Sequence, residues 1–551
     1  MKKSLRILSL LLVLVMLVSM VACTNTKPTT PSNDPQATDS QEPITLTIGL
    51  VQKANVESYD DNELTKWLEE QTGYNIEFML LSSDHAEAIT QLTAMMAGGE
   101  KLPDILYGIN GTQKMLPEWG SDGYLIDLTP YLEDKEASAT FWERWAEVPE
   151  DDAATIMAQA KDATTGEQYA MPYYSTGYSN RTSTQCYINT AWLKAVGKEM
   201  PTNYEELVDV LKAFKTGDPN GNGKADELPM VGGVGLYRAN IIQWLLNNWT
   251  YVNDSSIDAT YFFGVEDGKV YYPQVTEEYR EALRNIRQLV EDGLLSTMTW
   301  TVSQTSELLK LVTPTDGEAI AGVVGMHASV HIAADSPLMY EYQPLAPFNY
   351  APVTEPIYRL SACITSDCEN PDAAFDLLDF MYTEECSWRM NSGVPDVDWE
   401  FQTNADGVLG RVQINGDAYS GQTRQTWSFM DSTIINSAEP PYAKLVPAEA
   451  DKTWKNHRQD LLNKHTALYM EVGAKNNPDE VLYLPSYNAE EVAENGDIET
   501  NLKTYIETTR AEFLNGTLNI ETDWDKYIKE FYAIGADILL ENAQDAYDRS
   551  K

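Results

Sequence analysis

The sequence predicts an α/β protein with more than one lobe. Along residues 44–106, segments with the two-residue alternation of strands are followed by segments with helical periodicity. This order is typical of a largely parallel sheet covered by helices. A chain of 551 residues exceeds the size of a single hydrophobic core, since such cores stop growing near about 250–300 residues. We therefore expect two or more α/β lobes.

The first elements of the folded part begin at Ile44, where ITLTIGL has the β-branched alternation of a strand. The following helix would bury Leu64, Trp67 and Leu68 on one face and end at Gly73. Elements of both kinds then alternate. The expected order is strand 44–50, helix 62–73, strand 74–81, helix 85–97 and a third strand that starts near 102–106.

Later helices are predicted from their ends and their apolar faces. Thr202 and Glu205 have the spacing of a capping box and would open a helix before the loop at 218–227. Pro371 fits the first turn of a helix that continues to Tyr382. The C-terminal part has two apolar stripes, which are Ile498, Leu502, Tyr505, Thr509 and Phe513, then Trp524, Ile528, Phe531, Gly535 and Ile538.

Residues 218–227, DPNGNGKADE, have the chemistry of a calcium-binding loop. Calcium takes six to eight oxygen ligands in a flexible cage, and the loop begins like an EF-hand. Pro229 stands at the twelfth position in place of a bidentate Glu, so Glu227 would have to close the cage. A plain polar turn is the alternative, because Asp-Pro and Asn-Gly favour turns by themselves. The expected ligands of a structural Ca²⁺ are Asp218, Asn220, Asn222, the carbonyl of Lys224, Asp226 and Glu227.

The first 43 residues are interpreted as a targeting segment and a tether. Lys2, Lys3 and Arg6 precede the apolar run 7–22, which matches a secretory signal. Small residues before Cys23 resemble a bacterial lipobox, which predicts signal-peptide cleavage after residue 22 and a lipid on Cys23. Ordinary cleavage and an uncleaved anchor are the alternatives. Residues 24–43 lack large apolar side chains and are expected to form a disordered tether.

Composition excludes several classes of function. A formal net charge of −45 argues against nucleic-acid binding and against a basic membrane-binding patch. The sequence contains no P-loop, no dinucleotide-binding glycine pattern and no nucleophile elbow. His327 and His331 have a four-residue spacing but lack the Glu of a zinc-protease motif, so structural roles are favoured. The remaining cysteines, Cys186, Cys363, Cys368 and Cys386, allow a 363–368 or 363–386 bridge, with buried free thiols at least as favoured.

Several stretches, in this order, resemble the extracellular solute-binding proteins of family 1, the lipoprotein components of ABC importers for sugars and oligosaccharides. They are GGEKLPDILYG (98–108), DGYLIDLTPYL (122–132), GEQYAMPYY (166–174), YINTAWLKAVGKEMPTNYEEL (187–207), ENPDAAFDLLDFMYTEE (369–385), NSGVPDVDWE (391–400) and the helical C-terminus from 497. The resemblance covers nearly the whole mature chain. The calcium loop is also similar to the cation site of large oligosaccharide-binding members.

The resemblance implies a two-lobe, periplasmic-binding-protein-like fold with a central cleft and hinge crossovers. The expected parts are the first lobe (44–175), the second lobe (176–350), a return to the first lobe (351–430) and a helical part mainly on the second lobe (431–551). The implied protein is a non-enzymatic, monomeric receptor on the outer face of the cell membrane, held by its lipid alone. It would deliver a carbohydrate to the transmembrane subunits of an ABC permease. A peptide or other solute receptor and a surface glycoside hydrolase are the alternatives.

A sugar-binding cleft needs aromatic faces and planar polar groups. Thirteen Trp and 31 Tyr are present, and we select those expected in loops or at strand ends. A place in the hydrophobic core is the alternative for each aromatic residue. The candidates are Tyr173, Tyr174, Arg181, Trp244, Trp249, Trp300, Arg359 and Trp427.

Overall fold

A six-stranded sheet forms the first lobe in the computed structural model, with the strand order β14-β4-β11-β3-β1-β2. Its strands are β1 (Thr45–Val51), β2 (Asn75–Leu81), β3 (Ile105–Gly111), β4 (Met171–Gly177), β11 (Ile357–Ile364) and β14 (Ile434–Ser437). The structure describes residues 43–53, 56–111, 115–162, 165–177, 181–253, 263–315, 317–333, 336–353, 357–403, 407, 409–414, 433–437, 454–482, 485, 487–549 and 551. Ile44–Lys551 belong to one compact unit.

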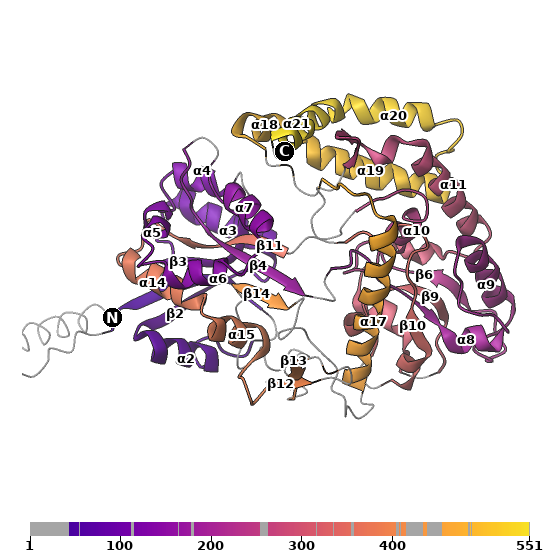
Figure 1. Ribbon diagram of the computed structural model, residues 1–551, viewed down its shortest axis with the longest axis horizontal. Coiled ribbons are helices and arrows are strands. Elements are labelled where there is room, and N and C mark those ends of the chain that lie inside the picture. The colour runs from indigo at the N-terminus through magenta and orange to yellow at the C-terminus, as the bar shows by residue number, and fades with distance from the viewer. Residues whose placement is uncertain are drawn as a thin grey trace, which may run out of the picture. The chain divides into compact units, whose positions relative to one another are not determined.

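Helices cover both faces of this sheet (Figure 1). Alternate residues of β3 point to opposite faces, so Ile105 packs in one buried cluster and Leu106 in the other. The helices of this lobe are α2 (Glu63–Thr72), α3 (His85–Gly98), α4 (Met115–Ser121), α5 (Thr129–Glu133), α6 (Ala139–Trp145), α7 (Glu150–Gln159), α14 (Pro371–Met381) and α15 (Glu384–Ser392). A hairpin of β12 (Trp399–Thr403) and β13 (Leu409–Gln413) follows.

A four-stranded sheet with the order β10-β5-β9-β6 forms the second lobe. Its strands are β5 (Cys186–Asn189), β6 (Leu228–Val231), β9 (Ala321–Gly325) and β10 (Tyr342–Pro344), with a separate hairpin of β7 (Gly264–Glu266) and β8 (Lys269–Tyr271). Its helices are α8 (Thr190–Ala195), α9 (Tyr204–Thr216), α10 (Ile241–Leu246), α11 (Glu277–Glu291), α12 (Thr305–Val312), α13 (Ala328–His331) and α17 (Trp454–Asn476), with 3-10 turns η2 (Pro273–Val275), η3 (Thr297–Trp300) and η4 (Pro337–Glu341).

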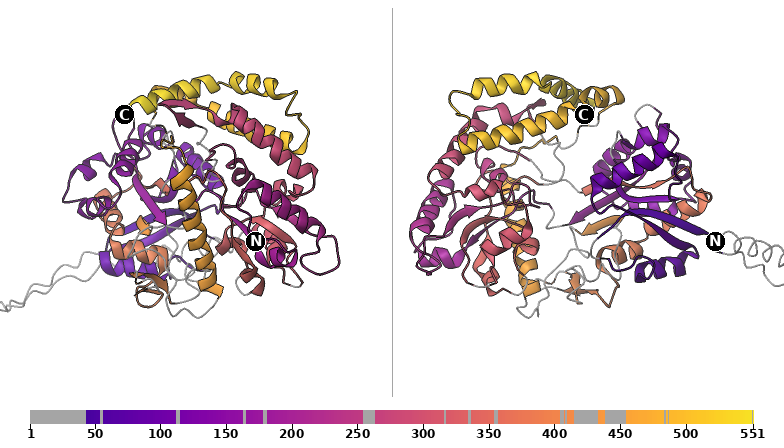
Figure 2. Two further views of the ribbon diagram at one scale, coloured as in Figure 1. Left: turned by 45° about the vertical axis from the view of Figure 1, so that its right-hand side comes forward. Right: turned by 180° about the vertical axis from the view of Figure 1, so that it is seen from behind.

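The C-terminal helices extend the core of the second lobe. They are α18 (Ala489–Asn495), α19 (Ile498–Asn515), α20 (Trp524–Ala533) and α21 (Ala536–Arg549). Figures 1 and 2 show α19 beside α11, and Phe513 shares one buried cluster with Leu283 and Ile286 of α11. The expected second stripe is wrong beyond Phe531. Gly535 has a φ of 110° between two separate helices, and Ile538 is exposed.

The expectation of largely parallel sheets is only partly correct. β1 runs parallel to β2 and β3, as the alternation of elements predicts. β11 runs antiparallel to both β3 and β4, and β5 runs antiparallel to β9 and β10. Each of these two strands follows a crossing from the other sheet, so no helix of the same lobe sets its direction. β14 also pairs with β4, although it lies beyond the expected boundary at residue 430.

Local signals place most helix ends correctly. Asn62 caps α2 by accepting from the Leu64 amide, and Gly73 ends it in the left-handed conformation. The cap of α9 is shifted by one residue. Asn203, and not Thr202, accepts from the amide of Glu206, and the Glu206 carboxylate binds the amide and hydroxyl of Thr202. Cys186, Cys363 and Cys386 are buried free thiols, which confirms that alternative for these three, and Cys368 is a partly exposed free thiol.

A buried carboxylate ties α14 to α6 in the first lobe. Asp379 of α14 accepts from the amides of Thr140 and Phe141 at distances of 3.2 and 2.8 Å. We expect Asp379→Ala to lower the free energy of unfolding by about 2–3 kcal/mol, because it leaves buried amides without an acceptor. Denaturant unfolding measures this loss. The exposed Asp376, one turn earlier on α14, is the matched control, and equal midpoints for the two alanine variants would contradict the prediction.

Candidate functional site

The loop at 218–227 joins the end of α9 to β6. Asp218 adopts a φ of 42°, and Gly221 and Gly223 each adopt a φ of 71°. Three backbone positions in the left-handed region fold the loop back on itself, and glycine takes up this conformation at no steric cost. The sequence therefore forms a tight wrap here and not an extended connection.

The side chains of the loop turn their oxygens toward its own backbone. The Gly223 amide donates to both carboxylate oxygens of Asp218, at 3.2 and 3.1 Å. The Asn222 amide donates to Oδ1 of Asn220 at 3.1 Å, and the Lys224 amide donates to Oδ1 of Asn222 at 2.8 Å. Asn222 Nδ2 donates to both oxygens of Asp226. The loop thus gathers side-chain oxygens around one short wrap.

Glu227 adds a buried acceptor at the end of the loop. Among the described residues, its Oε1 is buried and has no hydrogen-bond partner. A buried carboxylate oxygen without a donor is costly unless a cation or water satisfies it. No group of three or more His, Cys, Asp or Glu side chains in the described part of the chain is arranged to hold a metal. The loop, however, mixes carboxylates with amide oxygens and a carbonyl, which is the donor set that suits calcium.

Trp244 and Tyr174 lie in hydrophobic cores. Trp244 is fully buried in α10 and meets Phe348 edge to face at 5.7 Å. Tyr174 on β4 is buried in the core of the first lobe, and its hydroxyl donates to Asp152 at 3.1 Å. Neither ring offers a face to a sugar in this structure. The sequence did not reveal this because burial of these rings depends on elements distant along the chain.

Tyr173, Arg181, Trp249 and Trp300 are partly exposed. Trp249 lies after α10 and meets Tyr204 edge to face at 4.6 Å. Trp249 and Trp300 also pack against the core of the second lobe, so part of each ring is structural. Tyr173 is the register partner of Arg359 on the adjacent antiparallel strand β11. The structure therefore places two of the predicted residues side by side in the first lobe. Trp427 lies outside the described residues.

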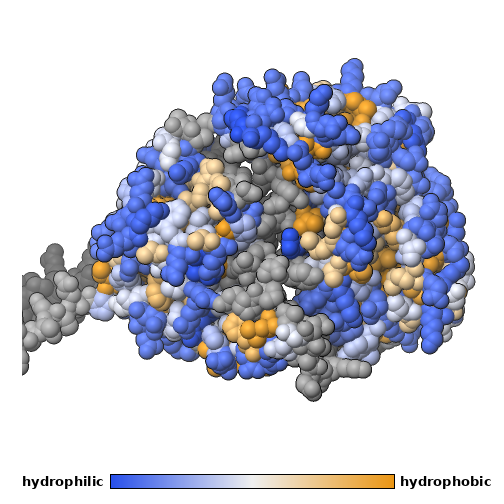
Figure 3. Space-filling view, in the orientation of Figure 1, coloured by the Kyte–Doolittle hydropathy of each residue, from blue (hydrophilic) through white to orange (hydrophobic). Residues whose placement is uncertain are grey.

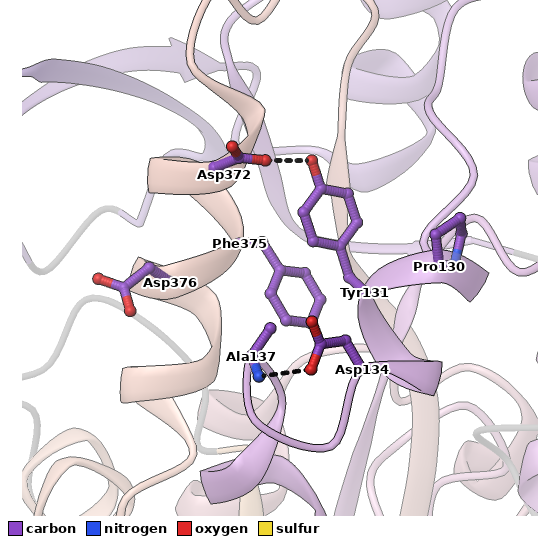
Figure 4. A pocket seen from close by; sticks show the side chains of 7 residues that line it. All are labelled: Pro130, Tyr131, Asp134, Ala137, Asp372, Phe375 and Asp376. Carbon is purple, nitrogen blue, oxygen red and sulfur yellow. Dashed lines mark hydrogen bonds between the residues drawn. The ribbon is translucent and has the colours of Figure 1, made fainter.

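A hollow of about 450 Å³ lies between α5 and α14 (Figure 4). Tyr131 stacks on Phe375 at 4.7 Å, and its hydroxyl donates to Asp372 at 2.8 Å. Burial and the Asp372 carboxylate together raise the pKa of Tyr131 to about 12, so this proton stays in place at neutral pH. Asp134 accepts from the Ala137 amide, and Asp376 points away from the other side chains in Figure 4. The sequence analysis did not select these residues.

A second hollow, of about 480 Å³, lies beside the end of α17. Its lining includes Tyr251, Asn477, Glu480 and Tyr547. Glu480 accepts from the hydroxyl of Tyr547, and Asn477 binds the backbone of Ala351. The polar groups of this hollow therefore already serve contacts within the protein. The only local signal that could have pointed to Asn477 is the Asn-Asn-Pro sequence at the end of α17.

One of the apolar areas in the view of Figure 3 lies near the β12–β13 hairpin. Val397, Phe401, Leu409 and Ile414 are exposed there. Arg411 lies over the ring of Trp388 at 4.6 Å beneath this area.

No helix in the described part of the chain is both long and apolar enough to cross a membrane.

His327 and His331 do not form a metal site in the described structure. The His327 amide donates to Nδ1 of His331 at 2.9 Å, and Ser329 Oγ lies 2.9 Å from Nδ1 of His327. His465 of α17 accepts at Nε2 from the amide of Cys186 at 3.2 Å. Burial lowers the pKa of His331 to about 4 and that of His465 to about 3, with Arg238 adding to the second effect. His331 and His465 are therefore neutral structural acceptors.

Comparisons with known proteins agree with this architecture. The family model for the bacterial extracellular solute-binding protein matches residues 53–385. The fructooligosaccharide ABC transporter substrate-binding protein FusA of Streptococcus pneumoniae is 26% identical over 521 residues, which cover 89% of this chain and 88% of that protein.

Two solved structures have the same fold. An EF-hand mutant of FusA in complex with fructo-nystose has a TM-score of 0.71 at 23% identity and covers 92% of this chain and 99% of its own. The alginate-binding protein AlgQ2 without calcium ion has a TM-score of 0.66 at 18% identity over 92% and 99% of the two chains. At these identities, the similarity to the two solved structures establishes the fold alone.

Proposed function

The chain belongs to the bacterial extracellular solute-binding proteins, and we propose that it captures an oligosaccharide outside the cell for an ABC importer. The observation that carries this proposal is the similarity to a fructooligosaccharide-binding protein along 89% of the chain. Binding between two lobes would favour the arrangement in which both lobes contact the ligand. A partner ATPase would supply the energy, and the transmembrane subunits of the permease would receive the sugar.

The proposed ligand contacts are the partly exposed residues of the predicted set, together with Arg359. Tyr173 and Arg359 are register partners on β4 and β11 in the first lobe, and Trp249 and Trp300 lie in the second. Aromatic rings stack on sugar faces, and guanidinium groups donate to hydroxyls. Arg181, which lies before β5, and Trp427, which lies outside the described residues, complete the proposed set. Trp244 and Tyr174 support the site from within the cores.

Saturable binding of an oligosaccharide is the expected result of isothermal titration with a panel that includes kestose. Product analysis after incubation separates a receptor from the glycoside hydrolase alternative, because a receptor releases the sugar unchanged. The adjacent carboxylates Glu490 and Glu491 do not favour hydrolysis. Glu491 of the pair 490–491 binds Arg549 through two short contacts and caps α18. Binding of peptides instead of sugars would support the other receptor alternative and contradict the sugar assignment.

We further propose that the 218–227 loop holds a structural Ca²⁺. The ligands would be the carboxylates of Asp218, Asp226 and Glu227, the amide oxygens of Asn220 and Asn222, and the Lys224 carbonyl. Support comes from the buried acceptor of Glu227 and from the tight wrap of the loop. Calcium here would fix the connection between α9 and β6 and take no part in sugar chemistry.

We propose that a lipid on Cys23 holds the protein at the outer face of the cell membrane as a monomer. The apolar run 7–22 and the small residues before Cys23 support this assignment. Mass spectrometry of the mature N-terminus tests it, since a diacylated cysteine at position 23 has a mass that ordinary cleavage does not produce. A Cys23→Ala variant released into the medium would agree with the assignment.

A further inference from the structure

A short segment carries the chain from the second lobe back to the first. The crossing segment, residues 348–353, lies between β10 of the four-stranded sheet and β11 of the six-stranded sheet. Its first amides are bound by residues that follow α10. The Phe348 amide donates to Oδ1 of Asn248 at 3.2 Å, and the Tyr350 amide donates to the carbonyl of Asn247 at 2.9 Å. The start of the crossing segment is thus fastened to the second lobe.

Asn477, the residue after α17, binds the same segment at Ala351, and we refer to this contact as the grip. The Ala351 amide donates to Oδ1 of Asn477 at 2.9 Å, and Asn477 Nδ2 donates to the Ala351 carbonyl at 2.7 Å. One side-chain amide therefore satisfies both polar groups of one backbone residue, as a neighbouring strand would. Ala351 is fully buried, so water does not replace these bonds without cost. Asn476 makes a single, exposed contact with the Asn349 carbonyl at 2.8 Å.

The backbone around this grip suits its geometry. Gly473 lies one turn before Asn477, and a Cβ at this position would lie 2.8 Å from Asn477 Nδ2 and 3.2 Å from the Ala351 carbonyl oxygen. Glycine therefore allows the helix to approach the crossing segment. Pro478 restricts Asn477 to extended conformations, and Pro352 does the same to Ala351. Both partners are held in position before they meet.

Beyond Ala351, the crossing segment pairs with the other crossing of the chain. Thr182 and Val353 form an antiparallel bridge, and the Ser183 amide donates to the Pro352 carbonyl at 3.4 Å. Asn253 Nδ2 donates to the Val353 carbonyl at 3.2 Å. The second lobe therefore contacts the crossing segment from Phe348 to Val353.

We propose that Asn477 is a positioning residue for ligand capture, which fastens the crossing segment to the second lobe so that the two move together. This inference rests on the proposed function, because a receptor that closes around its ligand needs a defined pivot. Without the grip, the crossing segment would no longer be held to the second lobe at Ala351. The ligand-free protein would then sample more lobe arrangements, and closure would cost more conformational entropy.

Asn477→Ala tests the inference, with kestose as the first probe and otherwise the panel sugar that the wild-type protein binds. We expect an affinity about tenfold weaker, since the two lost bonds hold a pivot and not the ligand. In the ligand-free variant, hydrogen exchange at the Ala351 amide becomes faster, and the radius of gyration from small-angle scattering increases. A purely structural role would change the melting temperature without changing the scattering of the folded protein.

Two further variants separate the grip from general stability. Gly473→Ala keeps Asn477 but displaces it, and alanine is the stronger helix former. This variant is expected to lose affinity to the same extent without loss of helix stability. Asn476→Ala removes only the exposed contact and is expected to bind within about twofold of wild type, in line with the small effects of surface substitutions.

Two results for Asn477→Ala would overturn the inference. One is an affinity within about twofold of wild type, and the other is a loss of affinity only in proportion to the unfolded fraction of the variant. Failure of the proposed function is a separate result, in which the wild-type protein binds no oligosaccharide of the panel. The ligand-free exchange and scattering then decide the inference alone. Values equal to those of Asn476→Ala overturn it, and faster exchange with a larger radius supports it.

Discussion

Removal of calcium with a chelator is expected to lower the melting temperature of the protein by roughly 5–10 °C. A ligand that binds only the folded state stabilises it by about 4 kcal/mol at a thousand times its Kd, and this shift follows for a large domain. The physical source is the set of carboxylates at Asp218, Asp226 and Glu227, which repel one another without a cation. Differential scanning calorimetry in calcium, in magnesium and in chelator measures the shift.

Glu227→Gln gives this prediction its sharpest form. With calcium, the variant should melt below wild type, because it has lost a charged ligand. In chelator, it should melt at or above wild type, because Glu227 Oε1 is then a buried charge without a partner. Glu199→Gln, on the exposed approach to α9, is the matched control and should follow wild type in both conditions. If chelator leaves the melting temperature of the wild-type protein unchanged, the result would contradict calcium binding by the loop.

We also expect the folded protein to lose stability in mild acid. Three of the five histidines, His327, His331 and His465, are buried in the second lobe. Burial lowers the pKa of all three, and Arg238 lowers those of His327 and His465 further. The unfolded chain binds protons near pH 6.5 and the folded chain does not, so stability is complete above pH 6.5 and falls as the pH drops.

For His331 this loss is on the order of 3 kcal/mol between pH 6.5 and pH 4. Urea unfolding at intervals across that range measures the slope. His331→Asn retains an acceptor for the His327 amide and cannot take up a proton, so we expect lower stability at pH 7 and a shallower slope. His85 is exposed at the start of α3, and His85→Asn should leave the slope unchanged. An unaltered slope in His331→Asn would contradict the assignment.

The sequence was sufficient to predict an element wherever one short segment contains all the residues that form it. Asn62 and Gly73 bracket α2 as predicted, because a cap is formed by residues within one turn of the helix end. The alternation of elements predicted β1, β2 and β3 and their parallel pairing. The turns of the loop at 218–227 were predicted from its Asp-Pro and Asn-Gly pairs, because such pairs act within a few residues.

Within the candidate site, the sequence suggested residue types but did not determine which side chains are exposed. Trp244 and Trp249 are five positions apart, yet the first is fully buried and the second is partly exposed. The difference depends on Phe348 and Tyr204, which pack on the two rings from distant parts of the chain. An aromatic side chain has the same composition signal in a core and in a ligand cleft, so only packing separates the two roles.

The sequence by itself determined the α/β class, the family and the wrap of the 218–227 loop, because these depend on periodicity and on residues close together in the chain. The tertiary structure decided the antiparallel placement of β5 and β11, the burial of Trp244 and the grip of Asn477 on Ala351. That grip joins residues 126 positions apart. A contact over this sequence distance forms only in the folded chain, and no local pattern encodes the partner of such a residue.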